Sequence, residues 1–392
     1  MKLVVIGLGQ CGGRIADEFA RLNKKAISQR GIEICPSIYA VNTDTADLSG
    51  LTTIKADFQH RILVGGRKTG GHGVGKINEL GAEIARSDSD KIIDAVRSSK
   101  RFYEADAFLL VASSSGGTGS GSLPIIAQQM KERYSDKPIY AMVVLPFEHE
   151  EETEERTLYN TAVCLKSINE VADAVFLVDN QRYVRKDVSL RYNINKINAL
   201  IAAPFYDLLC AGEEKKAKYI GAKTLDAGDI IQTISGWTTI GYGTSNVKLV
   251  TFPFEKVTNF RKKSTETHKG VQAMDEAFSE LSLKCNPKDS GRALYLVSAP
   301  ANEMNMDTIK ELGEWMREVA PNAIIRNGDY PRDKGQLSVT VVLSELSEVE
   351  KIRSYYSLST KLIPMIQKRQ KEIKNKLKDI DDMGKDIPSL LD

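Results

Sequence analysis

Residues 107–121 read AFLLVASSSGGTGSG, an apolar run that passes directly into a run of small residues. The apolar part predicts a buried strand, and the spacing of Leu123, Ile126 and Met130 predicts a helix immediately after it. The backbone amides and hydroxyl groups of Ser113–Gly121 would then lie at the N-terminus of that helix, an arrangement that binds anions. Because no lysine follows the last glycine, this is not a Walker A loop. The stretch therefore predicts a phosphate-binding loop of another kind.

A second glycine-rich turn lies near the start of the chain. Lys2–Ile6 is an apolar run, Gly7–Gly13 reads GLGQCGG, and Ile15 and Phe19 begin a helical pattern. Two such loops on neighbouring strands predict that a di- or triphosphate binds between them. A third cluster, Gly70–Lys76, is expected to close over the terminal phosphate. The candidate binding residues of the three loops are Gly9, Gln10, Cys11, Gly12, Gly13, Arg14, Gly73, Ser115, Gly116, Gly117, Thr118, Gly119 and Ser120.

The first half of the chain alternates apolar runs with amphipathic helical patterns, which is typical of a parallel sheet covered by helices. A broad apolar stripe over Arg191–Cys210 predicts a long central helix that kinks at Pro204. After residue 226 the pattern predicts an α+β domain with a mixed sheet. We expect an α/β fold with a Rossmann-like domain (1–188), the central helix (189–212), a second domain (213–345) and a charged helical extension (346–392). The expected strands are Lys2–Ile6, Ser37–Val41, Ala107–Ala112, Ile139–Leu145, Ala174–Val178, Trp237–Tyr242, Lys248–Phe252, Ala293–Ser298, Ala323–Arg326 and Leu337–Leu343.

The composition argues against several classes of protein. The 392 residues include 54 Lys+Arg and 52 Asp+Glu, so a formal net charge of +2 provides no field for general nucleic-acid binding. No apolar stretch approaches the ~20 residues that span a bilayer. The five cysteines are scattered, which is typical of reduced thiols in the cytosol, and the four histidines show no metal-ligand spacing. We expect a cytoplasmic protein with no nucleic-acid partner, no transmembrane segment and no metal site built from side chains.

The C-terminal tail, expected to begin at Pro364, is dense in charged residues. Ile366, Ile373, Leu377 and Ile380 form only a narrow helical stripe in it. This pattern is typical of a solvated or surface-docked helix, and it leaves open a helix that contacts a membrane surface or a protein partner.

Two of these motifs resemble a known family. GQCGG at Gly9–Gly13 and SGGTGSG at Ser115–Gly121 are similar to the phosphate loops of the tubulin/FtsZ superfamily of GTP-binding cytoskeletal proteins. That family's second signature reads GGGTG[ST]G, and Ser115 replaces its first glycine. Further segments resemble other loops of the family, in the same order along the chain: VNTDTADL (41–48), LPFEHEEETEER (145–156), VDNQR (178–182) and LDAGDI (225–230). The resemblance therefore covers nearly all of residues 1–345. The opening MKLVVIGLGQ, the segment GHGVGKINELGAEIA and the lack of a long linker are most similar to the archaeal CetZ group.

The resemblance implies GTP or GDP as ligand, with Mg²⁺ as counter-ion to the phosphates. It implies that Asn180 and Asn195 contact guanine and that an acid contacts the ribose. Counting along the chain leaves Glu150 and Glu152 both open for that acid. Asp226 and Asp229 would enter the nucleotide site of the next subunit in a head-to-tail protofilament and position the attacking water. The second domain would thus activate hydrolysis, and the resemblance to CetZ implies a role in cell shape.

Two other functions remain open at this point. The first glycine loop alone would fit an NAD(P)-dependent oxidoreductase, although the acid such enzymes carry about 20 residues further on has no counterpart at that distance. Asn42 and Asp44 are the polar residues at the end of the second expected strand. An oxidoreductase would also leave SGGTGSG and the pair Asp226 and Asp229 without a role. The other alternative is a GTP-binding regulator that does not polymerise, which two departures from the family pattern keep open: Ser115, and Thr224 where the family has Asn.

Overall fold

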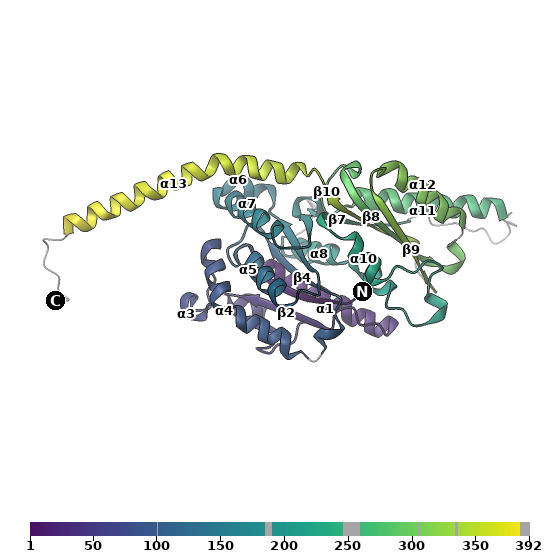
Figure 1. Cartoon of the computed structure of the whole chain (residues 1–392), viewed down its shortest axis with the longest axis horizontal. Helices are drawn as coiled ribbons and strands as arrows, with labels where there is room; N and C mark the ends of the chain where they lie inside the picture. The colour runs from purple at the N-terminus through teal and green to yellow at the C-terminus, as the bar shows by residue number, and fades with distance from the viewer. Residues whose placement is uncertain (100, 185–189, 246–258, 305, 334–335, 385–392) are drawn as a thin grey trace.

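The computed structural model describes residues 1–99, 101–184, 190–245, 259–304, 306–333 and 336–384 (Figure 1). The expected strand Lys248–Phe252 lies outside these residues. The strands are β1 (Leu3–Leu8), β2 (Ser37–Asn42), β3 (Arg61–Leu63), β4 (Ala107–Ser113), β5 (Ile139–Leu145), β6 (Ala174–Asp179), β7 (Gly236–Thr244), β8 (Ser290–Pro300), β9 (Ile324–Arg332) and β10 (Ser338–Leu346). The α-helices are α1 (Gly9–Arg30), α2 (Thr45–Ser49), α3 (Gly66–Thr69), α4 (Asn78–Ser98), α5 (Thr118–Arg133), α6 (Glu148–Thr153), α7 (Glu155–Asn169), α8 (Leu190–Ala202), α9 (Phe205–Ala211), α10 (Ala227–Thr233), α11 (Asn259–Ser279), α12 (Met306–Val319) and α13 (Glu350–Gly384).

The strands form one sheet in the order β3-β2-β1-β4-β5-β6-β7-β10-β8-β9. From β3 to β7 every pairing is parallel, whereas β10 runs antiparallel to both β7 and β8, and β8 and β9 pair in parallel. The predicted α/β class is thus confirmed, with a parallel first half and a mixed second half. The two halves join edge to edge, because β7 pairs with β6 at its start and with β10 along most of its length.

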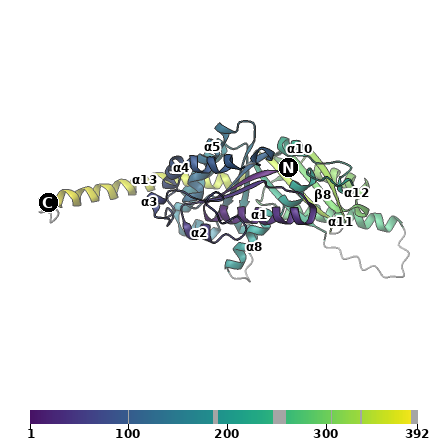
Figure 2. The same cartoon turned by 90° about the horizontal axis from the view of Figure 1, so that it is seen from below.

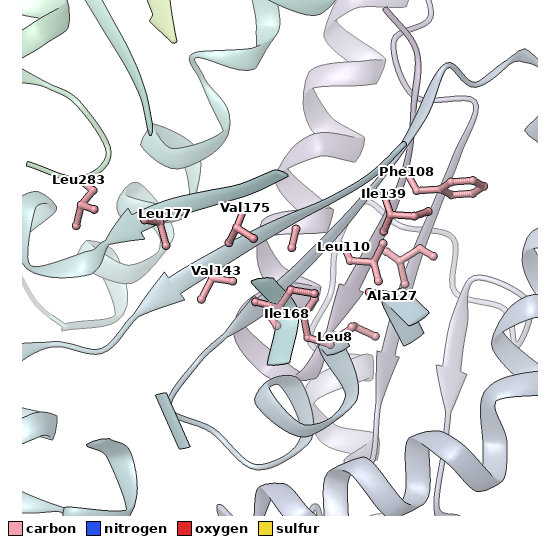
Figure 3. Packing of buried hydrophobic residues seen from close by; sticks show 14 of the residues in the cluster. Leu8, Phe108, Leu110, Ala127, Ile139, Val143, Ile168, Val175, Leu177 and Leu283 are labelled. Carbon is pink, nitrogen blue, oxygen red and sulfur yellow. The ribbon is translucent and has the colours of Figure 1, made fainter. Parts of the chain in front are cut away.

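Helices cover both faces of the sheet, and strand periodicity explains how. Along β1, Val4, Ile6 and Leu8 belong to one buried cluster, and Leu3 and Val5 belong to the other. Figure 3 shows the first cluster, in which Ala127 of α5 and Ile168 of α7 lie against side chains of β4, β5 and β6. The opposite face is covered by α1, α8 and α9. Figure 2 shows α1 and α8 from below. Strands buried on both faces account for the continuous apolar runs in the sequence.

The central helix is interrupted where a kink was expected. Helix α8 ends at Ala202 and α9 begins at Phe205, immediately after Pro204. Proline has no backbone N–H to continue the ladder, and its ring crowds the preceding turn. Both parts still bury their apolar faces, since Ile201 and Phe205 are each 2% exposed.

The C-terminal helix runs through the proline at which the charged tail was expected to begin. Helix α13 starts at Glu350, inside the expected helical extension 346–392, and Pro364 lies inside the helix. The first turns are held by packing on α7, because Ile352 and Tyr355 are buried there. The C-terminal part of α13 extends away from the rest of the molecule (Figure 1). Within the described residues, no helix is long and apolar enough to cross a membrane, and all five cysteines are free.

Candidate functional site

A pocket of about 350 Å³ opens at the carboxyl ends of β1 and β4. These adjacent strands lead in opposite directions across the sheet, to β2 on one side and to β5 on the other. Such a point of reversal in a parallel sheet leaves a crevice between two strand-to-helix loops. Helices α1 and α5 both begin there, so the unpaired amides and positive ends of two helices lie at one cavity.

The two glycine loops approach each other backbone to backbone. Gly9 has a φ of 71°, and a Cβ on it would lie 2.9 Å from the backbone nitrogen of Gly119. A Cβ on Gly12 would lie 2.0 Å from the carbonyl oxygen of Val111 on β4. Gly12 and Gly13 are buried under the loop and do not line the pocket. Gly12 lets α1 lie close against β4, whereas a Cβ on Gly13 would meet only side-chain atoms of Ala40 and Leu51, at 3.8 and 3.9 Å.

Gly116 has the opposite environment. It lines the pocket, and a Cβ built on it would meet no atom within 4 Å. The absent side chain therefore leaves room for a ligand against the backbone of the Ser115–Thr118 loop. Ser120, predicted as a binding residue, is buried behind this loop and donates its hydroxyl hydrogen bond to the carbonyl oxygen of Gly116.

A buried asparagine that the sequence analysis did not identify ties two of the loops together. Asn160 on α7 is fully buried, and its Nδ2 lies 2.9 Å from the carbonyl oxygen of Lys76 and 3.0 Å from those of Ser115 and Gly116. The third glycine cluster is thus fixed to the second. It is also fixed to the loop after β2, because the amide of Gly73 donates to the carbonyl oxygen of Thr43.

Charges of both signs face the cavity. Arg14 and Lys76 line it together with Asp44, Asp47 and Glu150. Asp47 accepts hydrogen bonds from the side-chain amides of Gln10 (2.5 Å) and Asn42 (3.0 Å), which orients it at the edge of the pocket.

Cys11 also lines the pocket, but its thiol is unreactive. Burial raises the pKa of Cys11 to about 12, and Arg14 opposes this rise. The thiol is therefore neutral near pH 7, and Cys11 is a poor nucleophile or redox group.

The remaining wall comes from the loops after β5 and β6 and from α8. Phe147, Glu150, Asn180, Ile194, Ile197 and Asn198 line it. Glu150 lies in this wall, whereas Glu152 is exposed and lies outside it. Of the two acids that the sequence left open for the ribose contact, only Glu150 therefore lines the pocket. Asn195 is exposed and outside the lining, whereas Asn198 is 6% exposed and faces the pocket. The helical spacing of Ile194, Ile197 and Asn198 marks one face of α8, which is the signal the sequence offered.

The structure brings most of the predicted binding residues into one pocket. These are Gly9, Gln10, Cys11, Arg14, Gly73, Ser115, Gly116, Gly117, Thr118, Gly119, Glu150 and Asn180. Gly12, Gly13, Ser120, Glu152 and Asn195 lie outside its lining. Further lining residues were not among the predicted ones: Asn42, Asp44, Asp47, Lys76, Phe147, Ile194, Ile197 and Asn198.

Asp226 and Asp229 are remote from this pocket. Asp226 caps α10 by accepting a hydrogen bond from the amide of Asp229 (2.9 Å), and Asp229 pairs with Nε of Arg326 at 3.5 Å. The buried side of α10 meets the beginnings of the parallel strands, because Ile230 and Ile234 surround one small void with Leu3 of β1 and Tyr140 of β5. The two acids therefore lie at the amino ends of strands whose carboxyl ends form the pocket.

Comparison with known proteins supports one family. The model of the "Tubulin/FtsZ family, GTPase domain" matches residues 2–186, and that of the "Tubulin-like CetZ, C-terminal domain" matches residues 187–361. Tubulin-like protein CetZ1 of Haloferax volcanii is 31% identical over 369 residues, which cover 90% of either chain.

Solved structures of relatives match the whole fold. CetZ1 from Haloferax volcanii, solved as a GDP-bound monomer, is 28% identical with a TM-score of 0.78, over 92% of this chain and 99% of that one. CetZ2 from the same organism, solved as a GTPγS-bound protofilament, is 26% identical with a TM-score of 0.80, over 94% of this chain and 100% of that one.

Proposed function

This chain belongs to the CetZ group of the tubulin/FtsZ family, and we propose that it binds GTP and hydrolyses it where subunits meet head to tail in a filament. The family and the nucleotide-bound relatives support a cytoskeletal GTPase. The location of hydrolysis between subunits rests on one observation in this chain. The pocket and the acids Asp226 and Asp229 lie at opposite ends of the same strands.

This separation is too large for the acids to act on a nucleotide in their own chain. The six residues of β1 alone span about 20 Å. A second copy in the same orientation, stacked along the strand direction, would place its α10 against the first copy's pocket. Such a contact joins two different surfaces and does not close on itself, so its repetition produces a filament. The relative solved as a protofilament supports this arrangement.

The pocket's parts suit the parts of a guanine nucleotide. The amides of the Gly116–Gly119 backbone and the N-termini of α1 and α5 would hold the phosphates. Asn180 and Asn198 offer amides with both a donor and an acceptor for the guanine edge, and Glu150 faces the same wall for the ribose hydroxyls.

Mg²⁺ would neutralise phosphate charge in this pocket. Among the described residues, no cluster of three or more His, Cys, Asp or Glu side chains could form a metal cage. This suits an ion held chiefly by phosphate and water oxygens, and Asp44 and Asp47, which line the same pocket, would accept hydrogen bonds from its water shell.

The acids of α10 suit the positioning of a water molecule. The side chain of Asp229 is 41% exposed, and Asp226 is exposed at the helix start. A carboxylate there can accept a hydrogen bond from a water molecule and orient that water for attack on a phosphate. Arg326 beside Asp229 supplies a positive charge that reduces repulsion between these acids and the incoming phosphates.

The test is GTP turnover per molecule against protein concentration, with Mg²⁺ present. We expect the specific rate to rise above a threshold concentration, because the site is complete only between subunits. Asp226→Ala should still bind GDP but lose about a hundredfold or more in turnover, the range typical for loss of a side chain that acts on the attacking water. Asp226→Asn is the matched control, because its side chain still caps α10 but carries no charge.

The two variants separate chemistry from folding. If the carboxylate positions water, Asp226→Asn loses turnover as Asp226→Ala does. Full turnover in Asp226→Asn would leave only a capping role. A flat rate at all concentrations would contradict a shared site and favour the non-polymerising regulator.

The resemblance to the CetZ group further supports a role in cell shape rather than in division. Deletion of the gene should then change cell outline while cells continue to divide. Arrested division would contradict this part of the proposal.

A further inference from the structure

We propose that Lys351 and Tyr355, in the first turns of α13, are positioning residues that set the affinity of the pocket for its nucleotide. The inference rests on the nucleotide-binding function proposed above. It adds the C-terminal helix, which contributes no residue to the lining of the pocket.

Lys351 bridges the two loops that carry one wall of the pocket. Its Nζ lies 2.9 Å from Oδ1 of Asp179 and 3.8 Å from Oε1 of Glu151. Asp179 directly precedes Asn180, and Glu151 directly follows Glu150. Each carboxylate held by Lys351 is thus the chain neighbour of a residue that lines the pocket.

Tyr355 reinforces the same loop. The side chain is 2% exposed, and its Oη donates a 2.5 Å hydrogen bond to Oε1 of Glu151. Burial and the neighbouring Glu151 raise the pKa of Tyr355, so its phenol remains a donor throughout the physiological range. One helical turn thus separates two side chains of α13 that converge on a single carboxylate.

The carboxylates they hold also shape the wall. Asp179 accepts a hydrogen bond from the amide of Gln181 (3.1 Å) and so caps the short 3₁₀ turn Asn180–Tyr183. The side chain of Gln181 accepts from the amide of Glu148 at 3.4 Å, which links this turn to α6. Glu150 accepts from the amide of Phe147 at 3.1 Å within α6. Movement of either loop would therefore displace Glu150 and Asn180 together.

Removing Lys351 would leave two largely buried carboxylates in mutual repulsion. The side chain of Asp179 is 13% exposed and that of Glu151 is 21% exposed. Burial raises the pKa of Glu151, Asp179 and Glu148 raise it further, and Tyr355 and Lys351 act against this rise. Loss of the cation favours separation of the two loops, and the pocket wall would open with them.

A purely structural role of this cluster would be to fasten α13 to the body. That attachment has other components, because Val349 and Ile352 are buried at the same end of the helix and Ser359 bonds the carbonyl oxygen of Leu158. The cluster itself contacts the loops of the pocket wall instead. A test must therefore distinguish nucleotide affinity from helix docking.

The experiment measures GDP dissociation constants on the full chain below its assembly threshold, with Mg²⁺. Lys351→Met should weaken binding about tenfold, within the range typical of coupling between sites, and Lys351→Arg should restore most of it. Tyr355→Phe, which keeps the ring, should weaken binding about threefold. Lys361→Met is the matched control, since it removes an exposed lysine ten residues further along the same helix, and its affinity should equal that of the wild type.

The kinetic counterpart is a split between KM and kcat. Lys351→Met should raise KM for GTP while kcat at saturating GTP stays near that of the wild type, because the acids proposed to position water lie at the opposite end of the strands from the pocket. A loosened α13 alone would leave KM unchanged. Amide exchange of residues 350–360 should also slow when GDP binds the wild type, because coupling between two sites is reciprocal.

The outcomes are distinguishable. If the wild type binds no guanine nucleotide, the proposed function fails and this inference fails with it. If the wild type binds GDP and Lys351→Met binds it equally well, only the inference is overturned. Equal weakening in Lys361→Met and Lys351→Met would also overturn it, since the effect would then be one of net charge.

Discussion

At the scale of single residues, two asparagines three positions apart on α8 face different surroundings. Asn198 is 6% exposed and lines the pocket, whereas Asn195 is exposed and outside it. The resemblance favoured Asn195, and only the rotation of the helix about its axis separates the two. A helix advances 100° per residue, so a shift of three positions moves a side chain by about one-sixth of a turn.

We expect Asn198→Ala to weaken GDP binding about tenfold, because loss of a buried hydrogen-bonding partner costs about 1–3 kcal/mol. Asn195→Ala should bind GDP as the wild type does. Titration with GDP and with a nucleotide of another base would check both variants. If Asn195→Ala weakened GDP binding more than Asn198→Ala, Asn195 would be the residue that contacts guanine.

At the scale of elements, a single carboxylate on α1 holds a segment that has no regular structure. Asp17 is 5% exposed and accepts hydrogen bonds from the amides of Thr52, Thr53 and Ile54 and from the hydroxyl of Thr52. Burial acts to raise the pKa of Asp17, but these hydrogen bonds outweigh it and lower the pKa below its ordinary value of 3.8. The chain after α2 is thereby fixed to the helix that begins at the pocket.

Because the folded pKa of Asp17 is lowered, its stabilisation is present above the ordinary value of 3.8 and is lost as the pH falls through the lower folded value. Asp17→Asn should therefore lower the free energy of unfolding by about 2–3 kcal/mol at pH 7. The difference from the wild type should shrink in acid. Urea unfolding at several pH values would measure it, with the exposed Asp90→Asn on α4 as control. A difference that stays constant down to the lowest pH would contradict this role of the charge.

Helix α13 shows how burial against neighbouring elements sets the bounds of a helix. Its sequence contains Pro364, which favours a boundary, but the helix runs through it from Glu350. The early turns are stabilised by burial of Val349, Ile352 and Tyr355, and this outweighs the cost of one missing hydrogen bond. A local signal of this kind is easily overruled by tertiary contacts.

At the scale of the whole molecule, the pocket and α10 lie at opposite ends of the parallel strands of one continuous sheet. The two ends are joined by packed strands and helices, so a nucleotide in the pocket and the acids of α10 keep their separation within a chain. Hydrolysis by shared sites therefore requires contact between different copies.

Two variants, each inactive alone, should complement each other. Gly116→Leu fills open space in the pocket and should block the nucleotide, while Asp226→Ala removes an acid and keeps the pocket. In a randomly mixed filament, about a quarter of the head-to-tail contacts would join an intact pocket to an intact acid. We expect an equal mixture to recover about that fraction of wild-type turnover. Sedimentation of both variants in one pellet without turnover would exclude a shared site.

The alternation of apolar runs, the two glycine loops and the small residues of Gly116–Gly119 were sufficient to predict the α/β class and most of the pocket. These features are local, because strand periodicity and backbone access depend on residues close together in the chain. The sequence by itself thus determined which loops form the pocket.

The tertiary structure alone decided the rest. Three features depend on residues distant in the chain. They are the presence of Glu150 and Asn198 in the pocket lining, the hydrogen bonds of Asn160 to the glycine loops, and the ion pair of Lys351 with Asp179. Their positions follow from the order of strands in the sheet and from the rotation of helices packed on it. Those are properties of the buried core as a whole, and no local pattern encodes them.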